Sequence, residues 1–141
     1  MAITLSILTS KTDMMSLSPL LQQLNPISTP EYLNTVLDDM IAHGYRMVTA
    51  NENGEYLAVS GIWVTTKFYS GKYLEMDNVV VAENHRSSGI GKILTDFITE
   101  LAREEGCETI MLDAYLDNEK AHIFYEREGF VKKGYHFLKK I

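Results

Sequence analysis

Residues 79–94, VVVAENHRSSGIGKIL, decide the fold that we expect for this chain. The three valines favour a strand, and from Ile90 onward apolar side chains recur at helical spacing. A polar turn that contains Gly89 and Gly91 joins the two elements. The first amides of a helix lack intrahelical acceptors and carry partial positive charge, and glycine lets a ligand approach the backbone. The stretch therefore predicts an anion site where a strand runs into a helix.

Length and composition narrow the class of protein. The chain has 141 residues, 45% of them hydrophobic and 23% charged, so we expect one globular domain over residues 1–141. Its net charge of −6 argues against nucleic acid, whose binding needs clustered cations. No apolar run approaches the roughly 20 residues of a membrane span. With no recognisable secretory signal and a single cysteine, Cys107, we expect a cytoplasmic protein without membrane contact.

The remaining pattern predicts an α/β protein with a mixed sheet. We expect strands at residues 3–8, 45–50, 56–66, 72–81, 109–114 and 130–138. We expect short helical pieces near residues 14–17 and 19–24, and longer helices at residues 30–44, 89–105 and 119–128. The hairpins are antiparallel, whereas the strand–helix–strand unit of residues 79–114 implies a right-handed parallel crossover. A change of pattern at Asp77 and Asn78 predicts a β-bulge.

The spacing of the glycine turn excludes two other phosphate loops. A Walker A loop needs Ser or Thr after its Gly-Lys pair, and Ile93 follows Gly91 and Lys92 here. A dinucleotide fingerprint needs three glycines after an early strand, and only two occur here, late in a meander. The remaining alternative is that the glycines only allow tight packing of strand and helix.

The turn and the last third of the chain resemble the GNAT N-acetyltransferases. Arg86-x-x-Gly89-x-Gly91 after a valine strand is similar to that family's Q/R-x-x-G-x-G/A acyl-CoA motif. The family's closing helix and strand are matched by Asn118, Ala121, Phe124, Tyr125, Gly129 and Phe130. The resemblance covers residues 45–141. It implies a single-domain GNAT-like fold, with a mixed, mostly antiparallel central sheet, a splayed parallel strand pair and helices on both faces.

The resemblance also implies acetyl-CoA as co-substrate. Backbone amides of the turn would bind the pyrophosphate, and the pantetheine arm would add like a strand to the valines. The residues implied are Val79, Val80, Val81, Arg86, Ser87, Ser88, Gly89, Ile90, Gly91, Lys92, Asn118, Ala121 and Tyr125. Three alternatives stay open: the valines are core, Lys92 is solvated, and Asn118 only caps its helix. The histidines lack metal-ligand spacing, so we expect no metal.

Three residues are expected to move protons. Tyr125 matches the family tyrosine whose hydroxyl lies near the thioester sulfur and protonates the leaving thiolate, although it could be a core aromatic. Glu75 and Asp77 are carboxylates two apart on one strand face, and either could remove the amine proton. Glu75 stands where some family members carry a glutamate base. Both could equally hold a cationic substrate or simply face solvent.

The expected function is transfer of an acetyl group from acetyl-CoA to a primary amine, by direct attack in a ternary complex. The alternatives are a non-catalytic acyl-CoA-binding or sensing module on the same fold, and a small interaction domain. The expected partners are acetyl-CoA and an amine acceptor, and the resemblance adds a homodimer formed through the C-terminal strands. The sequence does not name the acceptor.

Overall fold

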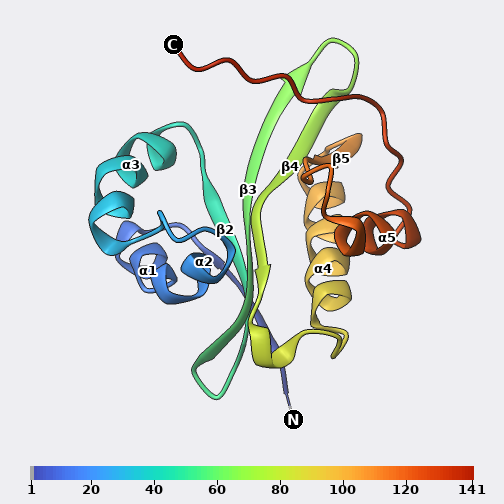
Figure 1. The fold of residues 1–141 in the computed structure, drawn as a ribbon. Coiled ribbons are helices and arrows are strands. Elements are labelled where there is room, and N and C mark those ends of the chain that lie inside the picture. The colour runs from blue at the N-terminus through green and yellow to red at the C-terminus, as the bar shows by residue number, and fades with distance from the viewer. Residues whose placement is uncertain (1) are drawn as a thin grey trace.

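A computed structural model describes residues 2–141 and shows a sheet between two layers of helices (Figure 1). In these residues the sheet has five strands in the order β1-β2-β3-β4-β5: Thr4–Leu8, Arg46–Glu52, Glu55–Lys67, Gly71–Val81 and Thr109–Leu112. Strands β1 to β4 pair antiparallel, and β5 pairs parallel with β4. The mixed, mostly antiparallel sheet predicted from the sequence is therefore confirmed.

Helices cover both faces of the sheet, as predicted. Those on one face are α1 (Lys11–Met15), α2 (Ser18–Leu24) and α3 (Pro30–Ala42), and those on the other are α4 (Ile90–Glu104) and α5 (Glu119–Arg127). A 3₁₀ turn, η1 (Glu83–His85), leads into α4. The hydroxyl of Thr29 accepts a hydrogen bond from the backbone amide of Tyr32 and so caps α3, which begins at Pro30. Among the described residues no helix is both long and apolar enough to cross a membrane.

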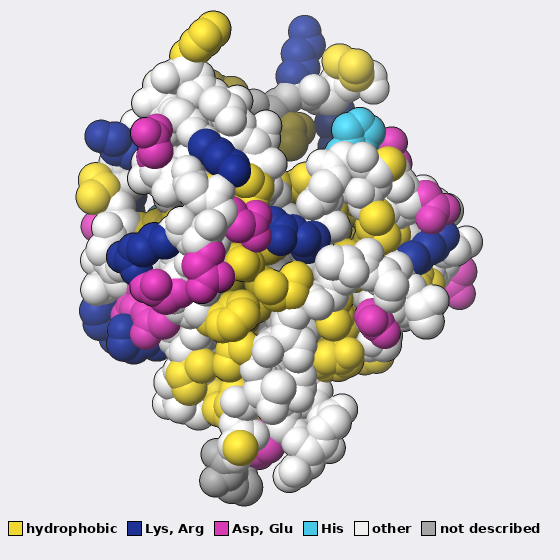
Figure 2. All heavy atoms as spheres, turned by 180° about the vertical axis from the view of Figure 1, so that it is seen from behind, with side chains coloured by type: hydrophobic (Ala, Val, Ile, Leu, Met, Phe, Trp, Pro, Cys, Tyr) yellow, Lys and Arg dark blue, Asp and Glu magenta, His cyan; other side chains and the backbone are white. Residues whose placement is uncertain are grey.

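Two apolar clusters hold the layers together. The cluster under α1, α2 and α3 includes Leu17, Leu37 and Tyr45, and the cluster under α4 includes Leu94 and Ile98. Each side chain of this size contributes about 1.5–3 kcal/mol when it leaves water. Seen from behind, hydrophobic side chains gather along the middle of the molecule, between flanks where charged side chains lie (Figure 2). Both apolar clusters include side chains of the sheet, so the sheet separates the two cores.

The predicted β-bulge is confirmed, and it lies in β4. Val59 pairs with Val80 but Gly61 pairs with Asp77, so three steps along β4 match two along β3. Asn78 adopts a left-handed φ of 53° there. Met76 and Val79 consequently join the same apolar cluster although they are three residues apart, which a regular strand would not allow. The bulge reverses which side chains of β4 face which helical layer.

The strand predicted at residues 130–138 is wrong. The chain after α5 forms no strand in the described residues and runs across one end of the sheet (Figure 1). Its apolar side chains are exposed at Val131, Tyr135, Phe137, Leu138 and Ile141. Strand propensity expresses a fit to a neighbouring strand, and it cannot say whether an edge lies within reach. Among the described residues this segment pairs with no strand.

An ion pair between β2 and the end of α4 should make stability depend on pH. Both guanidinium nitrogens of Arg46 donate to the carboxylate of Glu105 at 2.8 Å. The hydrogen bonds from Arg46 lower the pKa of Glu105 and outweigh desolvation by burial, which raises it. The stabilisation is therefore present above the unfolded-state pKa and is lost as pH falls through the folded one. We expect Glu105→Gln to cost about 1 kcal/mol at pH 7.

Urea denaturation of wild type and Glu105→Gln at pH 7 and pH 3 checks this, and the difference should vanish at the lower pH. Glu100→Gln is the matched control, because its partner Arg103 lies on the same helix and both side chains are exposed. An equal loss for the two variants would contradict the expectation.

Candidate functional site

The site begins where β4 and β5 part. Parallel pairing runs from Tyr73 opposite Thr109 to Met76 opposite Leu112, where β5 ends. Strand β4 continues to Val81, with β3 along its other edge. Residues 77–81 therefore extend past β5, and their backbone has no β5 ladder beside it. This segment contains all three valines that the sequence predicts to bind the cofactor arm.

The glycine turn follows directly after β4. Residues 86–89 are exposed, and Gly89 has a left-handed φ of 86° just before α4 begins at Ile90. Gly89 has no side chain to accept hydrogen bonds from the first amides of α4, so these amides are available to an anion. Arg86 Nε donates to the carbonyl of Val81 at 3.3 Å, and Ser88 donates to the carbonyl of His85. These bonds fold the turn back onto the end of β4.

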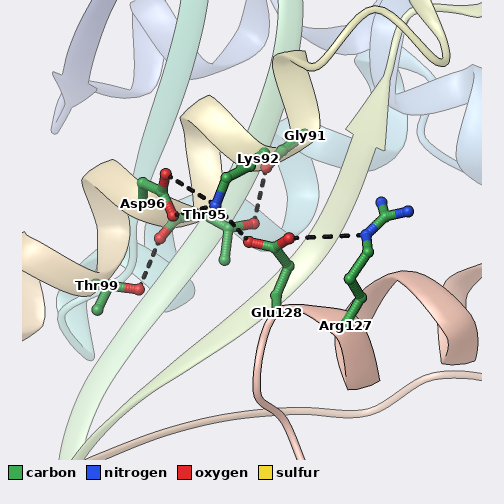
Figure 3. A network of polar contacts seen from close by, with 7 residues as sticks. All are labelled: Gly91, Lys92, Thr95, Asp96, Thr99, Arg127 and Glu128. Carbon is green, nitrogen blue, oxygen red and sulfur yellow. Dashed lines mark hydrogen bonds and ion pairs between the residues drawn. The ribbon is translucent and has the colours of Figure 1, made fainter.

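Lys92 links two helices instead of extending toward the turn. Its ammonium contacts Glu128 at 3.1 Å and Asp96 at 3.4 Å (Figure 3). The side chain of Glu128, at the end of α5, is only 9% exposed. Arg127 lies on the other oxygen of Glu128, at 3.9 Å. The cation expected near the phosphates is therefore engaged in holding α5 on the first turn of α4.

Helix α5 places Phe124 at this same first turn, with Tyr125 next to it. A Cβ atom at Gly91 would lie 3.4 Å from Cζ of Phe124, an ordinary van der Waals contact, so α5 packs against the first turn of α4. The ring of Tyr125 packs edge-on against Phe124 and Phe130, with centroids 5.2 and 5.5 Å away. Burial raises the pKa of Tyr125 to about 12, so its hydroxyl stays protonated through the neutral range. The side-chain oxygen of Asn118 caps the helix by accepting a hydrogen bond from the backbone amide of Ala121 at 3.2 Å.

The two predicted carboxylates share the face of β4 opposite to α4. Glu75 pairs across the sheet with Trp63, and Trp63 Nε1 donates to Asp77 at 3.2 Å. Burial raises the pKa of Glu75, and the negative charges of Asp113 and Asp77 raise it further. Asp113 follows β5 and contacts His136 at 3.3 Å. A carboxylate of raised pKa beside two others can accept a proton and attract a cation.

Two further residues belong to this face, and sequence reasoning gave them no role. Tyr45 is buried against Trp63, and the side chain of Asn78 donates to its hydroxyl. A glycine inside a strand, Gly61, was the one available signal, since it often marks a close approach. No group of three or more His, Cys, Asp or Glu among the described residues is placed to hold a metal ion.

In this α/β fold an extended strand leaves its parallel neighbour and runs into a glycine turn at a helix N-terminus, which is the arrangement that the resemblance to the GNAT N-acetyltransferases implies. Comparison with known families agrees: the profile described as the Acetyltransferase (GNAT) family matches residues 14–130. The chain belongs to the GNAT family and is an N-acetyltransferase of it, for which acetyl-CoA is the implied co-substrate.

Similar proteins support this assignment. An uncharacterized N-acetyltransferase of Bacillus subtilis, YhdJ, is 27% identical over 95% of this chain and 96% of its own. The glucosamine 6-phosphate N-acetyltransferase of Trypanosoma brucei brucei is 32% identical, but over 55% of this chain and 52% of its own. A putative acetyltransferase structure from Agrobacterium tumefaciens superposes with a TM-score of 0.80 at 26% identity, and all of both chains is covered. The structure of AAC(6')-Iy in complex with a bisubstrate analog superposes with a TM-score of 0.85 at 15% identity over nearly all of both chains, which shows a shared fold.

The two glycines of the turn should respond differently to alanine. Gly89 has space around it but needs a left-handed φ, so Gly89→Ala should cost about 1 kcal/mol. A Cβ at Gly91 would make ordinary contact with Phe124 inside a helix, where alanine is favoured by up to about 1 kcal/mol. Gly91→Ala should therefore be neutral or stabilising in urea denaturation. A larger loss at Gly91 than at Gly89 would contradict this account of the turn.

Proposed function

We propose that the whole chain, residues 1–141, acts as one domain that transfers the acetyl group of acetyl-CoA directly to a primary amine in a ternary complex. The observation that carries the proposal is the position of the free edge of β4. It has the anion turn at one end and the carboxylates Glu75 and Asp77 at the other. A pyrophosphate and a reacting amine would thus be held at opposite ends of one extended strand.

The cofactor would bind mainly through backbone groups. Amides from Arg86 to Lys92 would hold the pyrophosphate at the start of α4. The pantetheine arm would lie along Val79, Val80 and Val81, where the edge of β4 is free of β5. A backbone amide there would stabilise the oxyanion that forms on the acetyl carbon. Gly89→Ala should then weaken acetyl-CoA binding in calorimetry, and Gly91→Ala should retain it.

The proton transfers complete the reaction. The amine loses a proton to Glu75 or Asp77, directly or through water, and its nitrogen attacks the acetyl carbon. The carbon–sulfur bond then breaks, and Tyr125 donates a proton to the departing thiolate. The raised pKa of Glu75 favours it as the base, because its conjugate acid is then closer in strength to the groups that exchange protons near neutral pH.

The acceptor is a cationic amine without an acidic group of its own. Glu75, Asp77 and Asp113 put three carboxylates around the expected attack point, which would attract an ammonium and repel a phosphate. In this the chain would differ from the Trypanosoma relative, whose name gives a phosphorylated amino sugar as its acceptor.

A screen of amines that follows release of free coenzyme A thiol tests the function. We expect amine-dependent release, faster for diamines than for amino sugar phosphates. Initial rates should give intersecting lines, as expected for a ternary complex. Parallel lines, with an acetylated protein isolated in the absence of amine, would replace this mechanism by a ping-pong one. If no amine causes release of coenzyme A thiol, the proposed function is wrong.

Tyr125→Phe should lower kcat about 100-fold, near the lower end of what a positioned proton donor contributes. The KM for acetyl-CoA should change much less, because the ring and its packing remain. Because burial raises the pKa of Tyr125 to about 12, its ionisation should not limit the rate below about pH 10. The exposed Tyr135 supplies the control variant Tyr135→Phe, and equal rates for the two variants would remove Tyr125 from this role.

The pH–rate profile should identify the base. The rate should rise as Glu75 loses its proton, at a pH above the usual value of a glutamate. Asp113→Asn should move this rise to lower pH, because it removes a negative charge that raises the pKa of Glu75. Lys67 and His136, which lower the pKa of Glu75, remain in this variant. Glu75→Gln should abolish the rise, with activity recovering only as the free amine deprotonates. A rise that persists in Glu75→Gln and disappears in Asp77→Asn would assign the base to Asp77.

Two further parts of the proposal concern assembly and location. The exposed apolar side chains of residues 131–141 favour a homodimer in which a second copy covers them. Light scattering of the full chain, compared with a Phe137→Ser variant, measures this.

The single cysteine fits a reducing compartment, and we propose the cytoplasm.

A further inference from the structure

The bulge in β4 is supported from one side by an aromatic pair that the proposed mechanism does not use. Tyr45, just ahead of β2, is 2% exposed, and its ring lies 4.8 Å from that of Trp63 on β3. Both belong to the layer under α1, α2 and α3. The pair therefore sits on the same face of the sheet as Glu75 and Asp77.

Tyr45 occupies space that only a glycine leaves open. A Cβ atom at Gly61 would lie 2.1 Å from the hydroxyl oxygen of Tyr45 and 2.6 Å from Cε1 and Cζ of its ring. Gly61 is also the residue that pairs with Asp77, where the register shifts. The phenol is thus seated at the bulge itself, and the close approach of the ring to the strand depends on the missing side chain.

The aromatic pair contacts both residues at the start of the bulge. Asn78 Nδ2 donates to the hydroxyl of Tyr45 at 3.4 Å, and Trp63 Nε1 donates to Asp77 at 3.2 Å. Asn78 is held at a φ of 53°, a left-handed conformation that costs free energy even for asparagine. One hydrogen bond contributes a free energy of similar size, so its loss can release this conformation. The pKa of Tyr45 is raised to about 12 by burial, so the hydroxyl stays neutral.

We propose that Tyr45 is a positioning residue for acetyl transfer: seated over Gly61, its hydroxyl holds Asn78 in the left-handed conformation. The bulge then fixes the direction of the Asp77 carboxylate and of the backbone amide of Val79. This inference rests on the proposed function, since it assigns that amide and that carboxylate to the reaction. Tyr45 itself touches neither substrate.

Tyr45→Phe removes the hydroxyl and keeps the ring, and Tyr56→Phe is the control from the same apolar cluster. In Tyr45→Phe, amide hydrogen exchange at residues 77–80 should accelerate about 10-fold, because the bulge opens more readily. The kcat should fall about 10-fold while the KM for acetyl-CoA stays within about twofold, because only alignment at the reacting carbon is lost. The control should change neither quantity.

A double-mutant cycle tests whether Tyr45 acts through Asn78. The side chain of Asn78 is exposed, so Asn78→Ala should fold, and Tyr45→Phe should reduce kcat no further in that background. Additive losses of kcat, or unchanged exchange at residues 77–80 in Tyr45→Phe, would overturn the proposal. If wild-type protein acetylates no amine, the proposed function fails, whereas the exchange measurement still decides whether Tyr45 holds the bulge. Should Tyr45→Phe not fold, exchange in Asn78→Ala tests the same hydrogen bond from its other end.

Discussion

The mismatch in length between two parallel neighbours is the constraint on which the site depends. Strand β4 has eleven residues and β5 has four, so β4 continues past the end of β5 and residues 77–81 have no partner on that side. Backbone amides and carbonyls need partners, and an unpaired strand edge is a natural place for an extended ligand to add. The chain after β5 turns into α5, which packs on α4 and so leaves the edge of β4 open. The site proposed for the cofactor arm is therefore the stretch of β4 beside which β5 is absent.

The bulge lets β4 serve two purposes at once. Ahead of it, Glu75 and Asp77 face the layer of α1, α2 and α3, where charged side chains can meet an acceptor. Beyond it, Val79 and Val81 face the layer of α4 and help to bury that helix. Without the extra residue the alternation of the strand would place Val79 on the side of the carboxylates. One inserted residue thus separates the acidic side chains from the apolar ones within a single strand.

Much of this architecture was predictable because it is written in local patterns. Period-2 and helical spacing, the capping of α3 by Thr29, and the glycine turn before α4 gave the elements nearly as the structure has them. The change of pattern at Asp77 and Asn78 predicted the bulge. The strand expected at residues 130–138 is wrong because strand propensity expresses a fit to a neighbouring strand, and among the described residues this segment pairs with none. Lys92 was expected near the phosphates, but its ammonium contacts Glu128. Local patterns could not indicate this contact, because the two residues are 36 apart in the chain.

The sequence by itself determined the order of the elements as far as α5, the glycine turn before α4 and the residue types present, because short-range sterics and periodicity fix these. Only the tertiary structure decided which of those residues meet. The pKa of Glu75 is raised by burial and by the negative charge of Asp113, which follows β5, and the pKa of Tyr125 is raised by burial. The close approach of Tyr45 to Gly61 brings a residue just ahead of β2 onto β3, beside the bulge. Such contacts depend on distances between elements, and no local pattern in the chain records them.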